Sequence, residues 1–91
     1  MFRVVLSCGG IPTQSGSEAA ASIAKEFAEH RPWHKNVSCI WDGSRLVLAA
    51  ISDYDSDGQA LLDEFSDCVS AYVVGHFDSD MRVESVTRHD V

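Results

Sequence analysis

The strongest chemical motif in this sequence is a run of alternating carboxylates, Asp53-Tyr54-Asp55-Ser56-Asp57-Gly58, followed by Glu64 at the twelfth position counted from Asp53. This spacing matches the calcium loop of an EF-hand, in which carboxylates at the first, third, fifth and twelfth positions supply the hard oxygen ligands that Ca²⁺ prefers. The pattern therefore indicates a site for Ca²⁺ or another hard cation at Asp53, Asp55 and Asp57.

A helix cap accounts for the same carboxylates without a metal. The segment before the motif, residues 46–51, has the composition of a strand, whereas an EF-hand loop lies between two helices. If a helix begins near Asp57, Glu64 lies about 10 Å further along its axis and cannot join the same ligand cage. Asp55 and Asp57 would then be stabilised by the unpaired amides and the positive dipole of the helix N-terminus. We favour this interpretation and keep the cation site as the alternative.

The three cysteines, Cys8, Cys39 and Cys68, are odd in number and lack a CxxC spacing, so they predict neither a disulfide framework nor a zinc site. Reduced thiols are typical of the cytoplasm, where we expect the protein to be. Cys8 precedes Gly9-Gly10, between a predicted strand and a predicted helix, and is the candidate nucleophile. Because no sequence feature places a base beside it, we expect an unreactive thiol.

Two histidines, His30 and His34, are four residues apart, as in metal sites on one helix face. Pro32 lies between them and ends the helix that would bring both rings to one side, so we predict no metal site here. Trp33, beside this helix end, is better placed to contact a ligand than Trp41, which we assign to the core. No set of base, nucleophile and oxyanion donor can be assembled, and we expect a non-enzymatic protein without a cofactor other than Ca²⁺.

The net charge is strongly negative, because fourteen Asp and Glu oppose seven Lys and Arg, for a formal charge of −7 and a pI near 4.7. This charge argues against the nucleic-acid backbone and anionic membrane surfaces as binding targets. No apolar run approaches the roughly 20 residues that span a bilayer. A basic protein is the partner that this charge favours.

The negative charge is concentrated in residues 46–81, which contain eight acids and no Lys or Arg. Three of these acids, Asp63, Glu64 and Asp67, lie away from the apolar stripe of a predicted helix, and we expect them to bind a basic partner electrostatically. An inhibitor or immunity-type protein of a basic enzyme would have this character, and so would a small regulatory subunit.

The elements that must position these residues follow from hydrophobic periodicity and from Gly and Pro. They are a strand at 2–8, a helix at 16–31, strands at 36–41 and 45–52, a helix at 57–74 and a strand at 81–87. Capping-box spacings, Ser15 to Glu18 and Ser56 to Gln59, mark the two helix starts. This β-α-β-β-α-β order predicts a single α+β domain over residues 1–91 with ferredoxin-like topology, a four-stranded antiparallel sheet with two helices on one face.

The two middle strands are predicted to form a hairpin, since Asp42-Gly43 is typical of two-residue turns. With this turn at the tip, the facing pairs on the core side of the sheet are Trp41 with Ser44, Cys39 with Leu46, and Val37 with Leu48.

The opposite face of the sheet is more apolar than a solvated face requires. Side chains alternate between the two faces of a strand, so the residues that cannot face the helices are Ile40, Val47, Ala49 and Ile51. Burial against a second copy of the chain is the simplest way to remove this surface from water. We therefore expect a homodimer formed through the open sheet face, and a core that contains Phe27, Trp41, Leu48, Phe65 and Val69.

Overall fold

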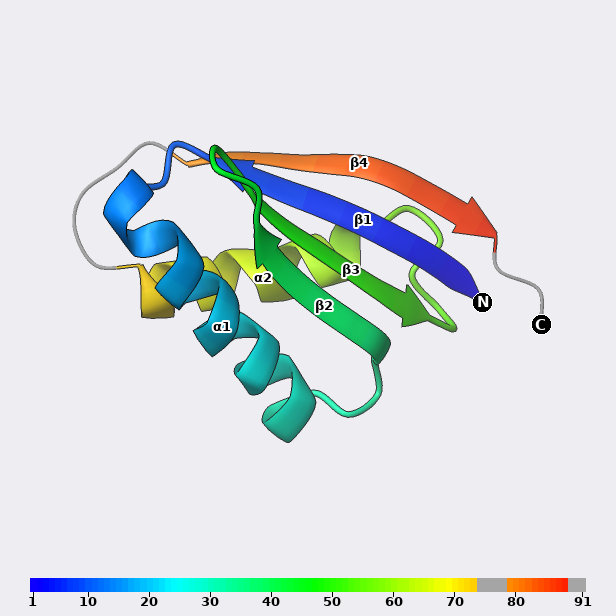
Figure 1. The fold of residues 1–91 in the computed structure, drawn as a ribbon. Coiled ribbons are helices and arrows are strands. Elements are labelled where there is room, and N and C mark those ends of the chain that lie inside the picture. Colours follow the sequence, from blue (N-terminus) through cyan, green and yellow to red (C-terminus); the bar gives the residue numbers. More distant parts are fainter. Residues whose placement is uncertain (74–78, 89–91) are drawn as a thin grey trace.

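The computed structural model describes residues 1–73 and 79–88 and contains the six predicted elements in the predicted order. They are β1 (Phe2–Gly9), α1 (Thr13–His30), β2 (Lys35–Trp41), β3 (Leu46–Ser52), α2 (Gln59–Tyr72) and β4 (Asp80–Arg88) (Figure 1). The strands are antiparallel in the order β2-β3-β1-β4, which confirms the ferredoxin-like α+β fold. The predicted end of the second helix, at residue 74, lies outside the described residues.

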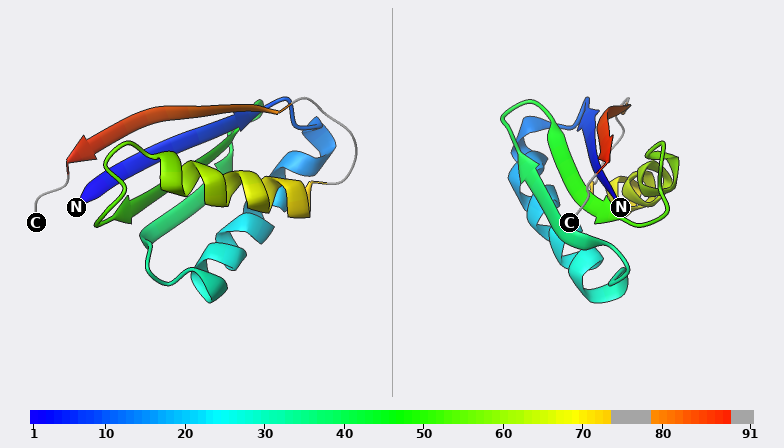
Figure 2. Two further views of the ribbon diagram at one scale, coloured as in Figure 1. Left: turned by 180° about the vertical axis from the view of Figure 1, so that it is seen from behind. Right: turned by 90° about the vertical axis from the view of Figure 1, so that its right-hand side faces the viewer.

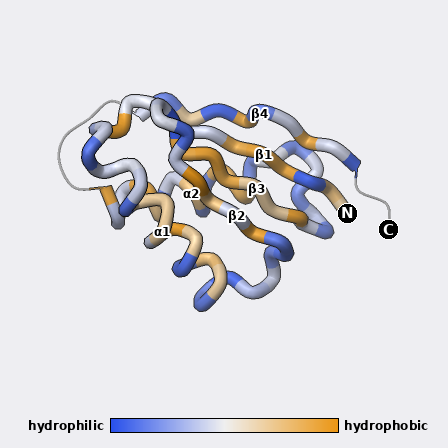
Figure 3. The backbone as a smooth tube through the Cα atoms, in the orientation of Figure 1, coloured by the Kyte–Doolittle hydropathy of each residue, from blue (hydrophilic) through white to orange (hydrophobic). Residues whose placement is uncertain are grey.

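The two central strands, β1 and β3, are the most apolar part of the sheet (Figure 3). Their pairing places Val4 opposite Ala50 and Leu6 opposite Leu48, and all four side chains are buried on the helix side. On the other side of β1, the pairing with β4 shifts between Val5 and Leu6. Because of this bulge, Leu6 pairs with Val83 and Val4 with Val86, so that both β4 valines pack against the core.

The hydrophobic core lies between the sheet and the two helices, which pack on the same face. Figure 2 shows α2 lying across the sheet and α1 running beside β2. The predicted core residues Phe27, Leu48, Phe65 and Val69 are buried, whereas Trp41, on the edge strand β2, is half-buried. Helix α1 approaches this ring so closely that a Cβ atom on Gly16 would lie 2.2 Å from it, so the packing depends on glycine at this position.

Both helices begin at positions other than the predicted ones. Helix α1 starts at Thr13, directly after Pro12, and has no side-chain cap, so the predicted capping box at Ser15 lies inside the helix. Pro12 itself is the N-cap residue, with φ −54° and ψ 131°, and it has no side-chain hydrogen-bonding group to cap the helix. Helix α2 starts at Gln59, after Gly58 in the left-handed region with φ +79°. Within the described residues, no helix combines the length and apolarity needed to cross a membrane.

The β2–β3 connection is a four-residue loop at 42–45, and the predicted two-residue turn was wrong. Trp41 pairs with Leu46 and Cys39 with Leu48, two positions away from the predicted register. The longer loop is held by Asp42, whose Oδ1 accepts hydrogen bonds from the backbone N–H groups of Ser44 (2.8 Å) and Arg45 (2.7 Å). A shift of two residues leaves every side chain on its predicted face, because strand side chains alternate with a period of two.

Candidate functional site

A buried histidine lies at the centre of a polar cluster between the two helices. The short connection after α1 turns His34 inward, where its side chain is fully buried. Three aromatic rings surround its imidazole, with centroid distances of 5.8 Å to Phe27, 5.8 Å to Trp33 and 6.3 Å to Tyr54. His34 therefore joins the end of α1, the loop after α1 and the loop after β3.

Glu64, on α2, connects this histidine to Arg31. The Oε2 atom of Glu64 contacts Nε2 of His34, and its Oε1 atom lies 3.2 Å from Nη1 of Arg31. The Glu64 side chain is only 18% exposed. The Arg31 guanidinium also lies over the Phe27 ring, 5.6 Å from the centroid. We name these three polar residues, Arg31, His34 and Glu64, the His34 cluster. It links the C-terminal end of α1 to α2 through charged hydrogen bonds that are largely removed from water.

Two nitrogen atoms of the His34 cluster, Nδ1 of His34 and Nε of Arg31, are buried and have no hydrogen-bond partner in the described part of the chain. The other ring nitrogen of His34, Nε2, contacts the Glu64 carboxylate, whose second oxygen faces Arg31. The site therefore holds one carboxylate between an imidazole and a guanidinium.

Burial disfavours the thiolate form of all three cysteines. Burial raises the pKa of the Cys68 thiol above its ordinary value, although the charge of Arg31 opposes the shift. Burial also raises the pKa of Cys8, against the opposing effect of Arg45, and raises that of Cys39 to about 12. All three cysteines are free thiols, and their raised pKa values favour the protonated, less nucleophilic form.

The carboxylates of the EF-hand pattern have separate roles in the structure. Asp55 is 3% exposed, and its two oxygens accept hydrogen bonds from the backbone N–H groups of Ala60 (3.2 Å) and Leu61 (2.9 Å). Asp57 Oδ1 accepts from the N–H of Gln59 at 3.0 Å, while Asp53 is exposed. These contacts are those of the predicted helix cap.

Glu64, which would be the last ligand of the calcium loop, contacts His34 and Arg31 instead. Residues 1–73 and 79–88 contain no group of three or more His, Cys, Asp or Glu side chains arranged to hold a metal ion.

The predicted acidic surface of α2 is reduced to two residues. Asp63 and Asp67 are exposed and lie one helical turn apart on the same stripe. Glu64 is adjacent to Asp63 in sequence, and neighbouring helical residues point about 100° apart, so the two cannot share one face. The structure turns Glu64 toward Arg31 and His34 instead.

The open sheet face carries the predicted apolar patch. Ile40 is 57% exposed, and Val47 and Ala49 are half-buried, as is Val5 on the adjacent strand β1. Ile51, the fourth predicted residue, is only 9% exposed. Ile40, on the edge strand β2, is therefore the most exposed residue of this patch.

Charged residues flank this patch at both ends. Arg3 and Lys35 pair in register with Ile51 at one end and form no ion pair within the described residues. At the other end, Asp80 binds both Arg45 (3.0 Å) and Arg82 (2.7 Å). These hydrogen bonds lower the pKa of the Asp80 carboxyl.

A hydrogen-bonded serine extends this charged end of the sheet. Arg45 Nε donates to Ser7 Oγ at 2.9 Å, and the Ser7 hydroxyl donates to Glu84 at 3.0 Å. Ser7 is 2% exposed, so its hydroxyl is held inside the network and not presented to solvent.

Most charged residues in the described part of the chain lie on one or the other of its two sides. The open sheet face carries four basic side chains, Arg3, Lys35, Arg45 and Arg82, and two acidic ones, Asp80 and Glu84. The helices α1 and α2 and the loops at 31–34 and 53–58 contain nine acids and two bases. The acids are Glu18, Glu26, Glu29, Asp53, Asp55, Asp57, Asp63, Glu64 and Asp67, and the bases are Lys25 and Arg31. The helical side therefore carries the negative charge of the described chain.

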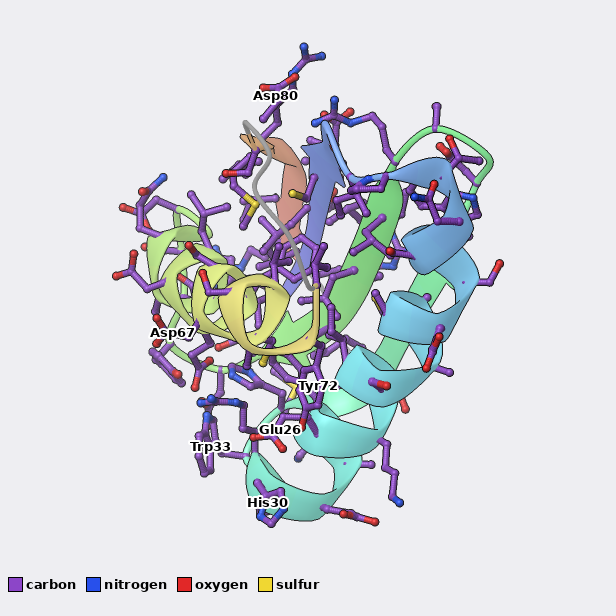
Figure 4. The ribbon with its side chains drawn as sticks, turned by 90° about the vertical axis from the view of Figure 1, so that its left-hand side faces the viewer. Glu26, His30, Trp33, Asp67, Tyr72 and Asp80 are labelled. Carbon is purple, nitrogen blue, oxygen red and sulfur yellow. The ribbon has the colours of Figure 1, made fainter. Side chains whose placement is uncertain are left out.

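Helices α1 and α2 also border a groove of about 260 Å³, lined by Ser22, Lys25, Glu26, Glu29, His30 and Tyr72. The Tyr72 hydroxyl donates to Glu26 Oε2 at 3.2 Å across the groove. Figure 4 shows Tyr72 close to Glu26, with His30 and Trp33 further along the same side of the molecule.

The sequence gives no sign that His34, Arg31 and Glu64 form a cluster. The spacing of His34 from His30 suggests only a pair of histidines, whereas His34 contacts Glu64, thirty residues away on α2. No local pattern signals such a pairing, since it exists only when α1 and α2 pack together.

Comparison with family models, with curated proteins and with solved structures finds no match for this chain.

Proposed function

We propose that this protein is a small interaction module without a catalytic role, and that its acidic helical side binds a basic protein. The observation that carries the proposal is the division of charge, with nine acids and two bases in the helices and their loops against a net positive sheet face. A one-sided negative field accelerates encounter with a cationic surface and orients the complex. An inhibitor of a basic enzyme and a regulatory subunit would both use this property.

Within this function, we propose that a second copy of the chain covers the open sheet face. A two-fold axis that lies in the interface and perpendicular to the strands would place Arg3 and Lys35 of one copy opposite the end that holds Asp80 and Glu84 of the other. In this arrangement the unpaired cations of the two copies do not face each other. The exposed Ile40, on the edge strand β2, would be buried at one side of this contact.

The acidic surface is tested by capture of basic proteins on the immobilised chain at about 50 mM and about 500 mM salt, because screening is far stronger at the higher concentration. We expect captured proteins to be basic and to be released at high salt. The double variant Asp63→Asn, Asp67→Asn should weaken capture. The matched control Ser85→Lys, Thr87→Lys changes the net charge by the same amount on the sheet face and should leave capture largely intact. Captured proteins that are not basic, or that resist high salt, contradict the proposal.

The self-association is tested by light scattering at about 100 μM, a concentration at which a specific interface of about 800 Å² per partner is occupied. We expect a dimer for the parent chain and a monomer for Ile40→Asp, which places a charge at the most exposed residue of the patch. A monomeric parent at this concentration refutes the dimer and leaves the acidic binding surface to its own test.

A further inference from the structure

Two exposed aromatic rings lie together beside the His34 cluster. Trp33 is 49% exposed and Tyr54 is 54% exposed, and they come from different loops, one after α1 and one after β3. Both rings pack on the same imidazole, at 5.8 Å and 6.3 Å. We name Trp33 and Tyr54 the aromatic pair.

The aromatic pair has a fixed support. The imidazole beneath it is fully buried and is held by Glu64, which Arg31 holds in turn. Rings supported in this way lose little conformational freedom when a partner binds. Trp and Tyr are also the residues that most often carry the binding energy of protein interfaces.

The surroundings of the aromatic pair are acidic. The pKa of the Tyr54 phenol is raised by partial burial and by the negative charges of Glu64, Asp55 and Asp53. Arg31, the nearby cation, is already paired with Glu64, and Asp53 itself is exposed. An anionic ligand such as a nucleic-acid phosphate would be repelled here, whereas a cation would be attracted by both the carboxylates and the ring faces.

We propose that Trp33 and Tyr54 are the contact at which an arginine or lysine side chain of the basic protein partner binds, stacked on the exposed rings and facing Asp53. This inference rests on the proposed function, and it names the place on the helical side where binding is strongest. The remaining acids of that side, including Asp63 and Asp67, then act at longer range to attract the partner.

The experiment uses a hexa-arginine peptide, blocked at both ends, titrated into the ¹⁵N-labelled chain and followed by NMR. We expect the largest shift changes in the backbone amides of residues 31–34 and 53–55 and in the Trp33 indole N–H. Trp33→Leu and Tyr54→Leu keep apolar bulk but remove the ring, and each should weaken peptide binding by about fivefold, within the range of cation–π energies. Tyr54→Phe keeps the ring and should bind like the parent.

Tyr72→Leu is the matched control, because Tyr72 is 40% exposed and also lies beside a carboxylate, Glu26, but away from the aromatic pair. It should bind the peptide like the parent. The exposed rings of Trp33 and Tyr54 can be removed with little loss of core packing, and thermal melting of each variant confirms that it is folded.

The outcomes separate this inference from the proposed function. Peptide binding that is released by salt but is unchanged in Trp33→Leu and Tyr54→Leu overturns the aromatic contact while the acidic surface stands. Binding that Tyr72→Leu weakens as much as Trp33→Leu, or the absence of binding at low salt, also overturns the aromatic contact. The capture experiment with Asp63→Asn, Asp67→Asn tests the proposed function independently.

Discussion

Replacement of Glu64 by alanine tests the internal role of this residue, because the change would leave His34 and Arg31 without their shared carboxylate. His34 is fully buried, and the side chains of Glu64 and Arg31 are 18% and 22% exposed. Loss of one partner from a buried ion pair costs about 3–5 kcal/mol, and the residual exposure of this pair places the expected loss near the lower end, at about 3 kcal/mol. For a domain of this size, that corresponds to a fall of roughly 12–24 °C in the melting temperature.

The assay is urea unfolding followed by circular dichroism, with Asp63→Ala as the matched control. Asp63 is the preceding residue on α2 and is exposed, so its replacement should change the free energy of unfolding by less than about 0.5 kcal/mol. Glu64→Gln keeps an acceptor for His34 but loses the charge that faces Arg31, and should lose about half as much stability as Glu64→Ala. If Glu64→Ala unfolds at the same urea concentration as Asp63→Ala, Glu64 is a surface carboxylate and the reasoning is refuted.

Three further perturbations follow from the packing and the pKa shifts. Gly16→Ala should lower the free energy of unfolding by about 1–3 kcal/mol in urea titrations, since the added Cβ would lie 2.2 Å from the Trp41 ring; an unchanged midpoint would contradict this packing. Asp55→Ala removes two hydrogen bonds to the α2 N-terminus and should cost about 1–2 kcal/mol equally with and without millimolar Ca²⁺; a melting temperature that Ca²⁺ raises in the parent alone would favour the cation site instead. Burial raises the pKa of Cys39 from 9.0 to about 12, so this thiol loses its proton at lower pH in the unfolded state than in the folded state, and the free energy of unfolding should fall as pH rises from 9 toward 12. The variant Cys39→Ser should show a smaller fall, and an equal fall in both proteins would contradict the role of Cys39.

The order of the elements and the sheet face of the hairpin residues in β2 and β3 could be predicted from the sequence. The apolar residues of β3 and of α2 repeat with the periods of a strand and a helix, and these periods depend on the backbone alone. The exact helix start and the hairpin register could not be predicted. Helix α1 begins directly after Pro12, before the serine that the capping-box spacing had marked as its start. At the hairpin, the side chain of Asp42 stabilises a longer loop than the Asp42-Gly43 pair predicts.

The capping role of Asp55 and Asp57 was also predictable, because a cap is a local structure formed by residues a few positions apart. The inward turn of Glu64 was not. Periodicity shows that Asp63 and Glu64 lie off the apolar stripe of α2, but it carries no information about which of them meets the end of α1.

The sequence by itself determined the fold topology, the net charge and the apolar open face of the sheet, since each depends on residue type and local spacing. Only the tertiary structure decided which charges are paired and which aromatic rings share a surface. Arg31 and His34 meet Glu64, and Tyr54 packs on the same imidazole as Trp33, across separations in sequence that no backbone period relates. Such contacts exist because two helices and two loops pack on one core, and the geometry of that packing is a property of the whole chain.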